Sequence, residues 1–198
     1  KTMARTNSSS TGRKGRAAGR DGTGSGAGRW PLIGVMVAVC IAVWVAFFPA
    51  LDNDFVSWDD PTYVTEQPIV LHPDAPRTPS VWRTPVSLNF QPLTMKTMAW
   101  NRGADDRAHP VEALEARPFI TMNIWLHALN ASLVLLFIHR LTNGNLAVAA
   151  FCAAIFALHP MHVESVAWVS ERKDVLYAFF FLAGLLTWQR WREKDEMR

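Results

Sequence analysis

Twenty consecutive residues without a charge, at positions 31–50, constrain this chain more than any other feature of its sequence. A helix rises about 1.5 Å per residue, so the run is about 30 Å long and matches the hydrocarbon core of a bilayer. A cleaved signal peptide has a shorter apolar region of about 7–15 residues and small residues at its cleavage site. No convincing site follows this run, and we predict a signal anchor that stays in the membrane.

Three further apolar runs, at 118–138, 141–158 and 175–188, have the composition of membrane spans. The last two are short, so we expect their ends to extend into neighbouring residues. Charged residues make up 19% of the 198 residues and hydrophobic residues 49%, whereas a soluble domain carries about 25% charged residues. The predicted fold class is an all-α polytopic membrane protein with about four transmembrane helices, the first at 31–50.

Basic residues are concentrated at one end of the chain. Residues 1–30 carry seven basic side chains and one acidic side chain, while the whole chain has a net charge of +3. A basic arm can bind nucleic acid, but ahead of a membrane span its charges more simply fix the orientation of the protein. We therefore predict a disordered cytoplasmic arm over 1–30 and no nucleic-acid partner.

The charges of the remaining loops follow the positive-inside rule. The segment 51–117 carries ten acidic and six basic residues, whereas Arg140 lies beside a predicted turn at 143–144 and four basic residues follow the fourth run. We predict an extracytoplasmic loop at 51–117 that contains interfacial helices, one of which ends near Trp100. A second outer loop is expected at 159–174, and a cytoplasmic end at 191–198.

Three polar residues interrupt the second apolar run. Asn123, His127 and Asn130 are spaced i, i+4, i+7, which puts them on one helical face. Polar groups are costly in lipid and usually face a protein interior or an aqueous cavity. We favour interhelical hydrogen bonding for all three, and a place in a substrate pocket stays open.

Two adjacent carboxylates, Asp59 and Asp60, lie between Trp58 and Pro61, a few residues outside the first span. Asp-Asp-Pro is typical of a solvated turn or of a helix N-cap. Two carboxylates at a membrane surface can also provide a general base and a partner that tunes its pKa. The spacing alone does not decide between these functions.

The second outer loop, HPMHVESVAWVSERKD, contains two histidines, three acidic residues and two basic residues in sixteen positions. If it is helical from its third residue, Glu164, Trp168 and Arg172 stack on one face at i, i+4, i+8. His159 and His162 make a poor metal site without further ligands, so we predict no metal. Basic residues at a membrane interface suit a lipid phosphate.

Four segments carry a resemblance to a known family. They are Phe55-Val56-x-Trp58-Asp59-Asp60-Pro61, Gln91-Pro92-Leu93-Thr94, Leu126-His127-x-x-Asn130 and HPMHVESVAWVSERKDVL. In this order they resemble the transmembrane and tetratricopeptide-repeat-containing O-mannosyltransferase family, most closely its bacterial branch, over about residues 30–190. That family belongs to the GT-C superfamily of polytopic glycosyltransferases. The resemblance implies a partial GT-C-like module over 31–190, in an N-terminal fragment whose further spans and repeats lie downstream.

The family transfers a sugar, typically mannose, from a polyprenyl phosphate to a protein hydroxyl on the extracytoplasmic side. The resemblance thus implies a multi-pass protein of a bacterial inner membrane that needs no cofactor. Its partners are a polyprenyl-phosphate sugar, an acceptor protein and the lipid bilayer.

The resemblance also implies roles for residues of the two outer loops. Asp59 and Asp60 occupy the motif of the catalytic carboxylate. Transfer from a glycosyl phosphate with inversion needs a base for the acceptor hydroxyl and cations for the departing phosphate. We expect Arg172 and Lys173 to bind that phosphate. The residues expected to shape the pocket are His159, His162, Glu164, Asp174, Asn123 and His127.

Two other functions stay open. One is a membrane-anchored repeat scaffold whose transferase module has lost activity, and the other is a polyprenyl-lipid transporter. The corresponding structural alternative is that Glu164 pairs with Arg172 and that Asp59 and Asp60 cap a helix.

Overall fold

The computed structural model describes residues 29–103 and 113–195, and these residues form helices and loops with no strand among them. The elements in chain order are α1 (Arg29–Phe47), η1 (Phe48–Asp52), η2 (Pro61–Thr65), α2 (Pro68–Leu71), α3 (Pro92–Asn101), α4 (Arg117–Leu141), α5 (Leu146–Leu158), α6 (His162–Ala167), η5 (Val169–Glu171) and α7 (Arg172–Asp195). The basic arm is predicted to be disordered, and its residues 1–28 lie outside the described residues.

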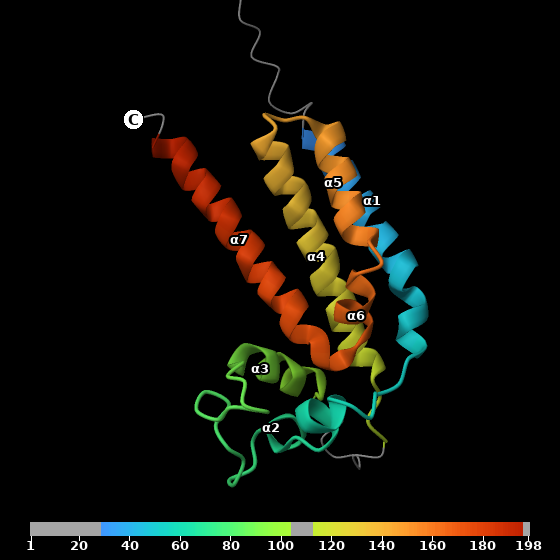
Figure 1. Ribbon diagram of the computed structural model, residues 1–198, viewed down its shortest axis with the longest axis vertical. Coiled ribbons are helices and arrows are strands. Elements are labelled where there is room, and N and C mark those ends of the chain that lie inside the picture. The colour runs from blue at the N-terminus through green and yellow to red at the C-terminus, as the bar shows by residue number, and fades with distance from the viewer. Residues whose placement is uncertain (1–28, 104–112, 196–198) are drawn as a thin grey trace, which may run out of the picture.

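Helix α4 is the centre of a helical bundle, in contact with α1, α5 and α7. Figure 1 shows α1, α4 and α5 running together, while α7 leans away from α4 towards its own C-terminal end. On α5, the buried residues Ala149, Ala153 and Ala157 repeat every four positions along one face. Small side chains allow membrane helices to approach each other closely, which accounts for the tight packing of α5 in the bundle.

The predicted turn between the second and third apolar runs is present. Asn143 has φ 52° and Gly144 has φ 91°, so both occupy the left-handed region that asparagine and glycine adopt most readily. The Asn145 side chain then accepts a hydrogen bond from the Val148 N–H at 3.2 Å and caps α5. The turn makes α4 and α5 an antiparallel hairpin, as the sequence predicts.

Two of the described helices are long and apolar enough to cross a membrane, namely Trp30–Asp52, which combines α1 with η1, and α4. They match the predicted spans at 31–50 and 118–138. Helix α5, at the predicted third span, has only 13 residues and is about 20 Å long. Helix α7 covers the predicted fourth span at 175–188 and continues through charged residues to its end at Asp195. The four-span topology therefore stays a prediction.

Several exposed tryptophans lie near the ends of the bundle helices or in the segment after η1, whereas Trp125 is exposed within α4. Trp30 is the second residue of α1, and Trp188 and Trp191 lie near the end of α7. At the opposite end, Trp58 and Trp100 are exposed in the segment that follows η1. Tryptophan is enriched at both membrane–water interfaces, so this arrangement supports a membrane setting.

Residues 53–103, which we call the outer part, fold across one end of the bundle (Figure 1). Proline occupies the first position of η2, α2 and α3, where its missing N–H has no partner to lose. Helix α3 buries Met95, Met98 and Ala99 and contacts α4 and α7. The helix predicted to end near Trp100 is thus present and lies against the bundle.

One sequence prediction for the second outer loop is wrong. Helix α6 ends at Ala167, Trp168 is extended at φ −102° and ψ 129°, and α7 begins only at Arg172. Glu164, Trp168 and Arg172 therefore do not stack on one helical face. The chain leaves the helix because its backbone groups are bonded elsewhere: the Asn123 amide donates to the Trp168 carbonyl at 3.0 Å, and Asp60 accepts from the Ser170 N–H at 3.1 Å.

Candidate functional site

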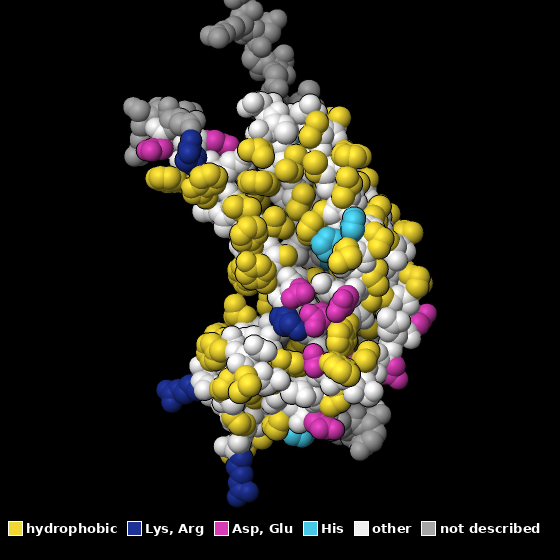
Figure 2. Space-filling view, viewed as in Figure 1, with side chains coloured by type: hydrophobic (Ala, Val, Ile, Leu, Met, Phe, Trp, Pro, Cys, Tyr) yellow, Lys and Arg dark blue, Asp and Glu magenta, His cyan; other side chains and the backbone are white. Residues whose placement is uncertain are grey.

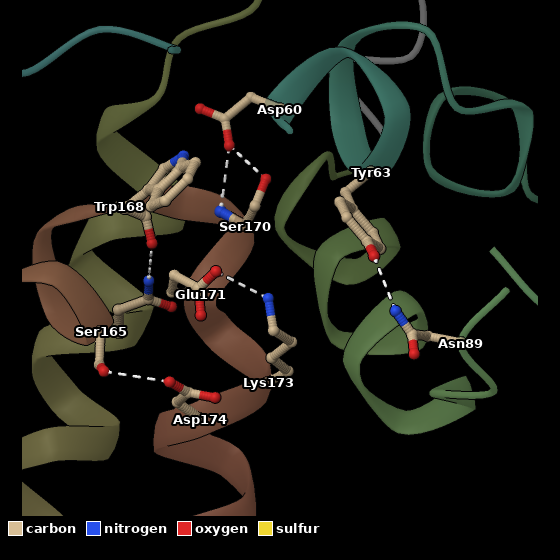
Figure 3. A network of polar contacts seen from close by, with 10 residues as sticks. Asp60, Tyr63, Asn89, Ser165, Trp168, Ser170, Glu171, Lys173 and Asp174 are labelled. Atoms are coloured by element: carbon tan, nitrogen blue, oxygen red, sulfur yellow. Dashed lines mark hydrogen bonds and ion pairs between the residues drawn. The ribbon is translucent and has the colours of Figure 1, made fainter. Parts of the chain in front are cut away.

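Asp60 is fully buried and links the outer part to the bundle. Its Oδ1 accepts hydrogen bonds from the backbone N–H of Ser170, at 3.1 Å, and from the Ser170 hydroxyl. Its Oδ2 accepts from the Val56 N–H at 2.8 Å. Figure 3 shows the Asp60 carboxylate directed at Ser170 in the loop between α6 and α7. Both carboxylate oxygens are thus occupied by protein donors, as the burial of a charge requires.

Asp59 differs from its neighbour. Its side chain is half-buried, and within the described residues its carboxylate makes no hydrogen bond, although its backbone carbonyl accepts from the Tyr63 N–H at 3.1 Å. Neither aspartate caps η2 through its side chain. The two carboxylates of the motif are therefore chemically distinct, because Asp60 is held by three donors while the Asp59 carboxylate has none among the described residues.

Arg172 is completely buried at the start of α7. Its Nε donates to Asn123 Oδ1 at 2.9 Å, its Nη2 donates to the Phe119 carbonyl at 2.7 Å, and its Nη1 donates to Asn101 Oδ1. The guanidinium also lies 5.7 Å from the centre of the Phe119 ring. Burial lowers the pKa of Arg172 to about 9, which leaves it protonated at neutral pH. Among the described residues Arg172 has no carboxylate partner, and the alternative pairing with Glu164 is absent.

Lys173 is half-buried beside Arg172 and faces the outer part. Its Nζ lies 2.7 Å from Glu171 Oε1 and 5.8 Å from the centre of the Tyr63 ring. Figure 3 shows the contact between Lys173 and Glu171. Partial burial acts to lower the pKa of Lys173, but the hydrogen bond and the charge of Glu171 outweigh it, so the pKa is raised. Lys173 therefore carries a positive charge at physiological pH.

A groove of about 300 Å³ opens next to Lys173. One wall is the start of α3 with the residues before it, and the other is the first half of α7. The lining residues are Phe90, Gln91, Pro92, Leu93, Thr94, Lys173, Leu176, Tyr177 and Phe180. Figure 2 shows hydrophobic side chains along this edge of the molecule, with acidic and basic side chains gathered where the bundle meets the outer part. The lining of the groove is thus mostly apolar and includes one cationic side chain, that of Lys173.

The remaining residues of the second outer loop lie at the surface around the α6–α7 joint. Glu164 and Asp174 are exposed, and Asp174 accepts a hydrogen bond from the Ser165 hydroxyl at 3.2 Å. The His159 ring accepts from the Met161 N–H through Nδ1. Burial and the neighbouring His159 lower the pKa of His162. None of these residues lines the groove beside Lys173.

The three polar residues of α4 bind backbone carbonyls of neighbouring segments. Asn123 donates to Trp168, Asn130 donates to Val175 at 2.8 Å, and His127 Nε2 lies 3.0 Å from the Ala157 carbonyl. The His127 ring also lies 5.2 Å from the His162 ring. The predicted interhelical bonding is confirmed for all three.

The structure thus brings the two sequence motifs together through Asp60 and Ser170, and Lys173 is one of the residues that line a groove. Sequence reasoning missed Ser170 and Asn101, which hold Asp60 and Arg172 respectively. No pattern in the sequence identifies Asn101, since it is the last residue of a short helix far from its partner. Over 29–103 and 113–195, no three His, Cys, Asp or Glu residues lie close enough to hold a metal ion.

No protein-family model and no solved structure matches this chain. Protein O-mannosyl-transferase TMTC4 of Homo sapiens is 29% identical over 182 residues, which are 79% of this chain and 23% of that protein. TMTC3 of Homo sapiens is 28% identical over 134 residues, covering 63% of this chain and 14% of the relative. TMTC1 of Mus musculus is 35% identical over 72 residues, covering 36% and 8%.

In each case the chain spans less than a quarter of the relative's length. The identities are low, but three different O-mannosyl-transferases are similar to this chain. The chain is therefore distantly similar to protein O-mannosyl-transferases, and this similarity suggests a glycosyltransferase role.

Proposed function

We propose that this chain works within a membrane glycosyltransferase that moves a sugar, mannose in the first instance, from a polyprenyl phosphate to a protein hydroxyl. The similarity to protein O-mannosyl-transferases supports the reaction class. The observation that carries the donor class is the groove beside Lys173, because a mostly apolar lining that includes one cation suits a prenyl chain attached to a phosphate.

In this proposal Asp59 is the general base. The acceptor hydroxyl must lose a proton as it attacks the sugar carbon, and the bond from that carbon to the phosphate oxygen breaks. A base needs a carboxylate oxygen that is free to receive the proton. Asp59 meets this requirement, whereas both oxygens of Asp60 are bonded to Ser170 and Val56. We therefore assign Asp60 to holding the loop that carries Asp59.

Lys173 is our candidate contact for the phosphate. A lysine ammonium has three N–H donors, and Glu171 takes one of them, so two can reach an anion in the groove. As the donor bond breaks, negative charge grows on the departing phosphate and a fixed cation stabilises it. His159, His162, Glu164 and Asp174 remain candidates for shaping the acceptor side.

The proposal is tested with the full-length protein in nanodiscs, polyprenyl-phosphate mannose and an acceptor protein. We expect transfer of mannose to a serine or threonine hydroxyl, and none from GDP-mannose. An inactive scaffold would bind the acceptor without any transfer. A lipid transporter would move the prenyl lipid across the bilayer in the absence of acceptor and would transfer nothing. Either result would refute the proposal.

A further inference from the structure

Arg172 is chemically unusual among the described residues. A buried guanidinium normally pairs with a carboxylate, since burying an isolated charge is costly. Here its three hydrogen-bond acceptors are neutral oxygens of Asn101, Phe119 and Asn123. The nearby carboxylates are engaged elsewhere, Glu171 with Lys173 and Asp174 with Ser165. These three acceptors satisfy the hydrogen-bond donors of the guanidinium, but they do not neutralise its charge.

The partners of Arg172 belong to different parts of the molecule. Phe119 and Asn123 lie on α4, Arg172 begins α7, and Asn101 is the last residue of α3. The bond to Asn101 is the one that ties α3 to the bundle through this guanidinium. Because α3 begins at Pro92 and carries one wall of the groove, a shift of α3 against α7 changes the width of the groove.

We propose that Arg172 is a positioning residue that clamps α3 to α4 and α7 and so sets the width of the groove beside Lys173, without contacting the phosphate itself. The inference deepens the proposed function and rests on it for the nature of the groove's occupant. A guanidinium suits the clamp because its planar fork of N–H groups has a fixed geometry, so one side chain can fix three acceptors. A lysine ammonium would not hold the same three oxygens.

Substitutions at Asn101 distinguish a positioning role of Arg172 from direct binding of the phosphate by Arg172. Asn101→Ala removes the acceptor and opens the clamp. Asn101→Asp keeps an acceptor of the same shape and strengthens the bond to Arg172 through charge, but it neutralises the guanidinium. If Arg172 only positions α3, the Asn101→Asp variant keeps its affinity for the phosphate ligand. If Arg172 binds the phosphate directly, this variant loses affinity. Asn53, which is exposed on the same outer part, supplies matched controls as Asn53→Ala and Asn53→Asp.

Two measurements on the full chain in zwitterionic nanodiscs decide the question. The first is hydrogen exchange of the α3 amides, which needs no ligand. The second is the affinity for farnesyl phosphate, with farnesol as the uncharged counterpart and inorganic phosphate as the headgroup alone. If α3 is docked only about a tenth of the time in Asn101→Ala, the apparent affinity falls about tenfold.

We expect Asn101→Ala to speed α3 exchange and to weaken farnesyl phosphate binding about tenfold, while Asn101→Asp and both Asn53 variants behave as the unsubstituted chain. A tenfold loss of farnesyl phosphate affinity in Asn101→Asp would overturn the proposal, as would unchanged α3 exchange in Asn101→Ala. If Asn101→Ala does not fold, the affinity of Asn101→Asp for farnesyl phosphate decides alone: retained affinity supports the positioning role and lost affinity overturns it. Failure of the full-length protein to transfer sugar, with the exchange results as expected, refutes the proposed function and leaves the clamp standing.

Discussion

The hydroxyl of Ser170 offers the sharpest test of how the outer part is held to the bundle. Ser170→Ala removes one of three donors to the buried Asp60 carboxylate and leaves the Ser170 and Val56 N–H groups in place. A hydrogen bond to a charged group contributes about 1.5–3 kcal/mol when buried. We therefore expect Ser170→Ala to lower the free energy of unfolding by about 1.5–3 kcal/mol.

The chain provides a control of the same chemistry. The Ser165 hydroxyl also donates to a carboxylate, that of Asp174 at 3.2 Å, but this pair is exposed to solvent. Water replaces an exposed hydrogen bond at little cost, so Ser165→Ala should change the free energy of unfolding by less than about 0.5 kcal/mol. The two variants differ in burial and not in the group removed.

The assay is reversible unfolding of the full chain in mixed micelles, in which the sodium dodecyl sulfate fraction is raised at a fixed dodecyl maltoside concentration. Equal costs for Ser170→Ala and Ser165→Ala would refute the view that Asp60 is a buried anchor. A loss in Ser165→Ala larger than in Ser170→Ala would refute it as well.

Two further predictions concern the histidine cluster and the contact between α4 and α7. Burial beside His159 lowers the pKa of His162 below the 6.5 of the unfolded chain, so the unfolded state binds the proton first as pH falls. Stability should therefore be full above about pH 6.5 and decline below it, and His162→Gln should flatten the decline measured between pH 7.5 and 5.5. Asn130→Ala should cost about 0.6–1.7 kcal/mol by removing its bond to the Val175 carbonyl, as measured by the same micelle titration, and no loss would contradict that contact.

Local patterns in the sequence were sufficient for several elements. The i, i+4, i+7 spacing of Asn123, His127 and Asn130 identified one face of α4, and that face does bond to neighbouring segments. The Asn143–Gly144 pair identified the turn before α5, because both residues tolerate positive φ. Such features depend on residues within one or two helical turns of each other.

The break at Trp168 could not be predicted in the same way. Residues 162–172 have a pattern compatible with one continuous helix, and what ends α6 is Asn123, 45 residues away, together with Asp60, 110 residues from Ser170. The burial of Arg172 has the same origin, since its partner Asn101 lies 71 residues earlier in the chain. Contacts of this range are tertiary, and they override local helix propensity.

The central claim, that Asp59 is a base and Asp60 an anchor, is tested most directly by comparing Asp59→Asn with Asp60→Asn in the full-length protein. The measurements are mannose transfer from polyprenyl-phosphate mannose, donor affinity, and the free energy of unfolding. We predict that Asp59→Asn lowers turnover by about 10²–10⁴-fold with donor affinity and stability unchanged. Asp60→Asn should instead lower stability by about 1–3 kcal/mol, because its NH₂ group would face an N–H donor. Near-normal turnover in Asp59→Asn, with the protein folded and the donor bound, would contradict the account.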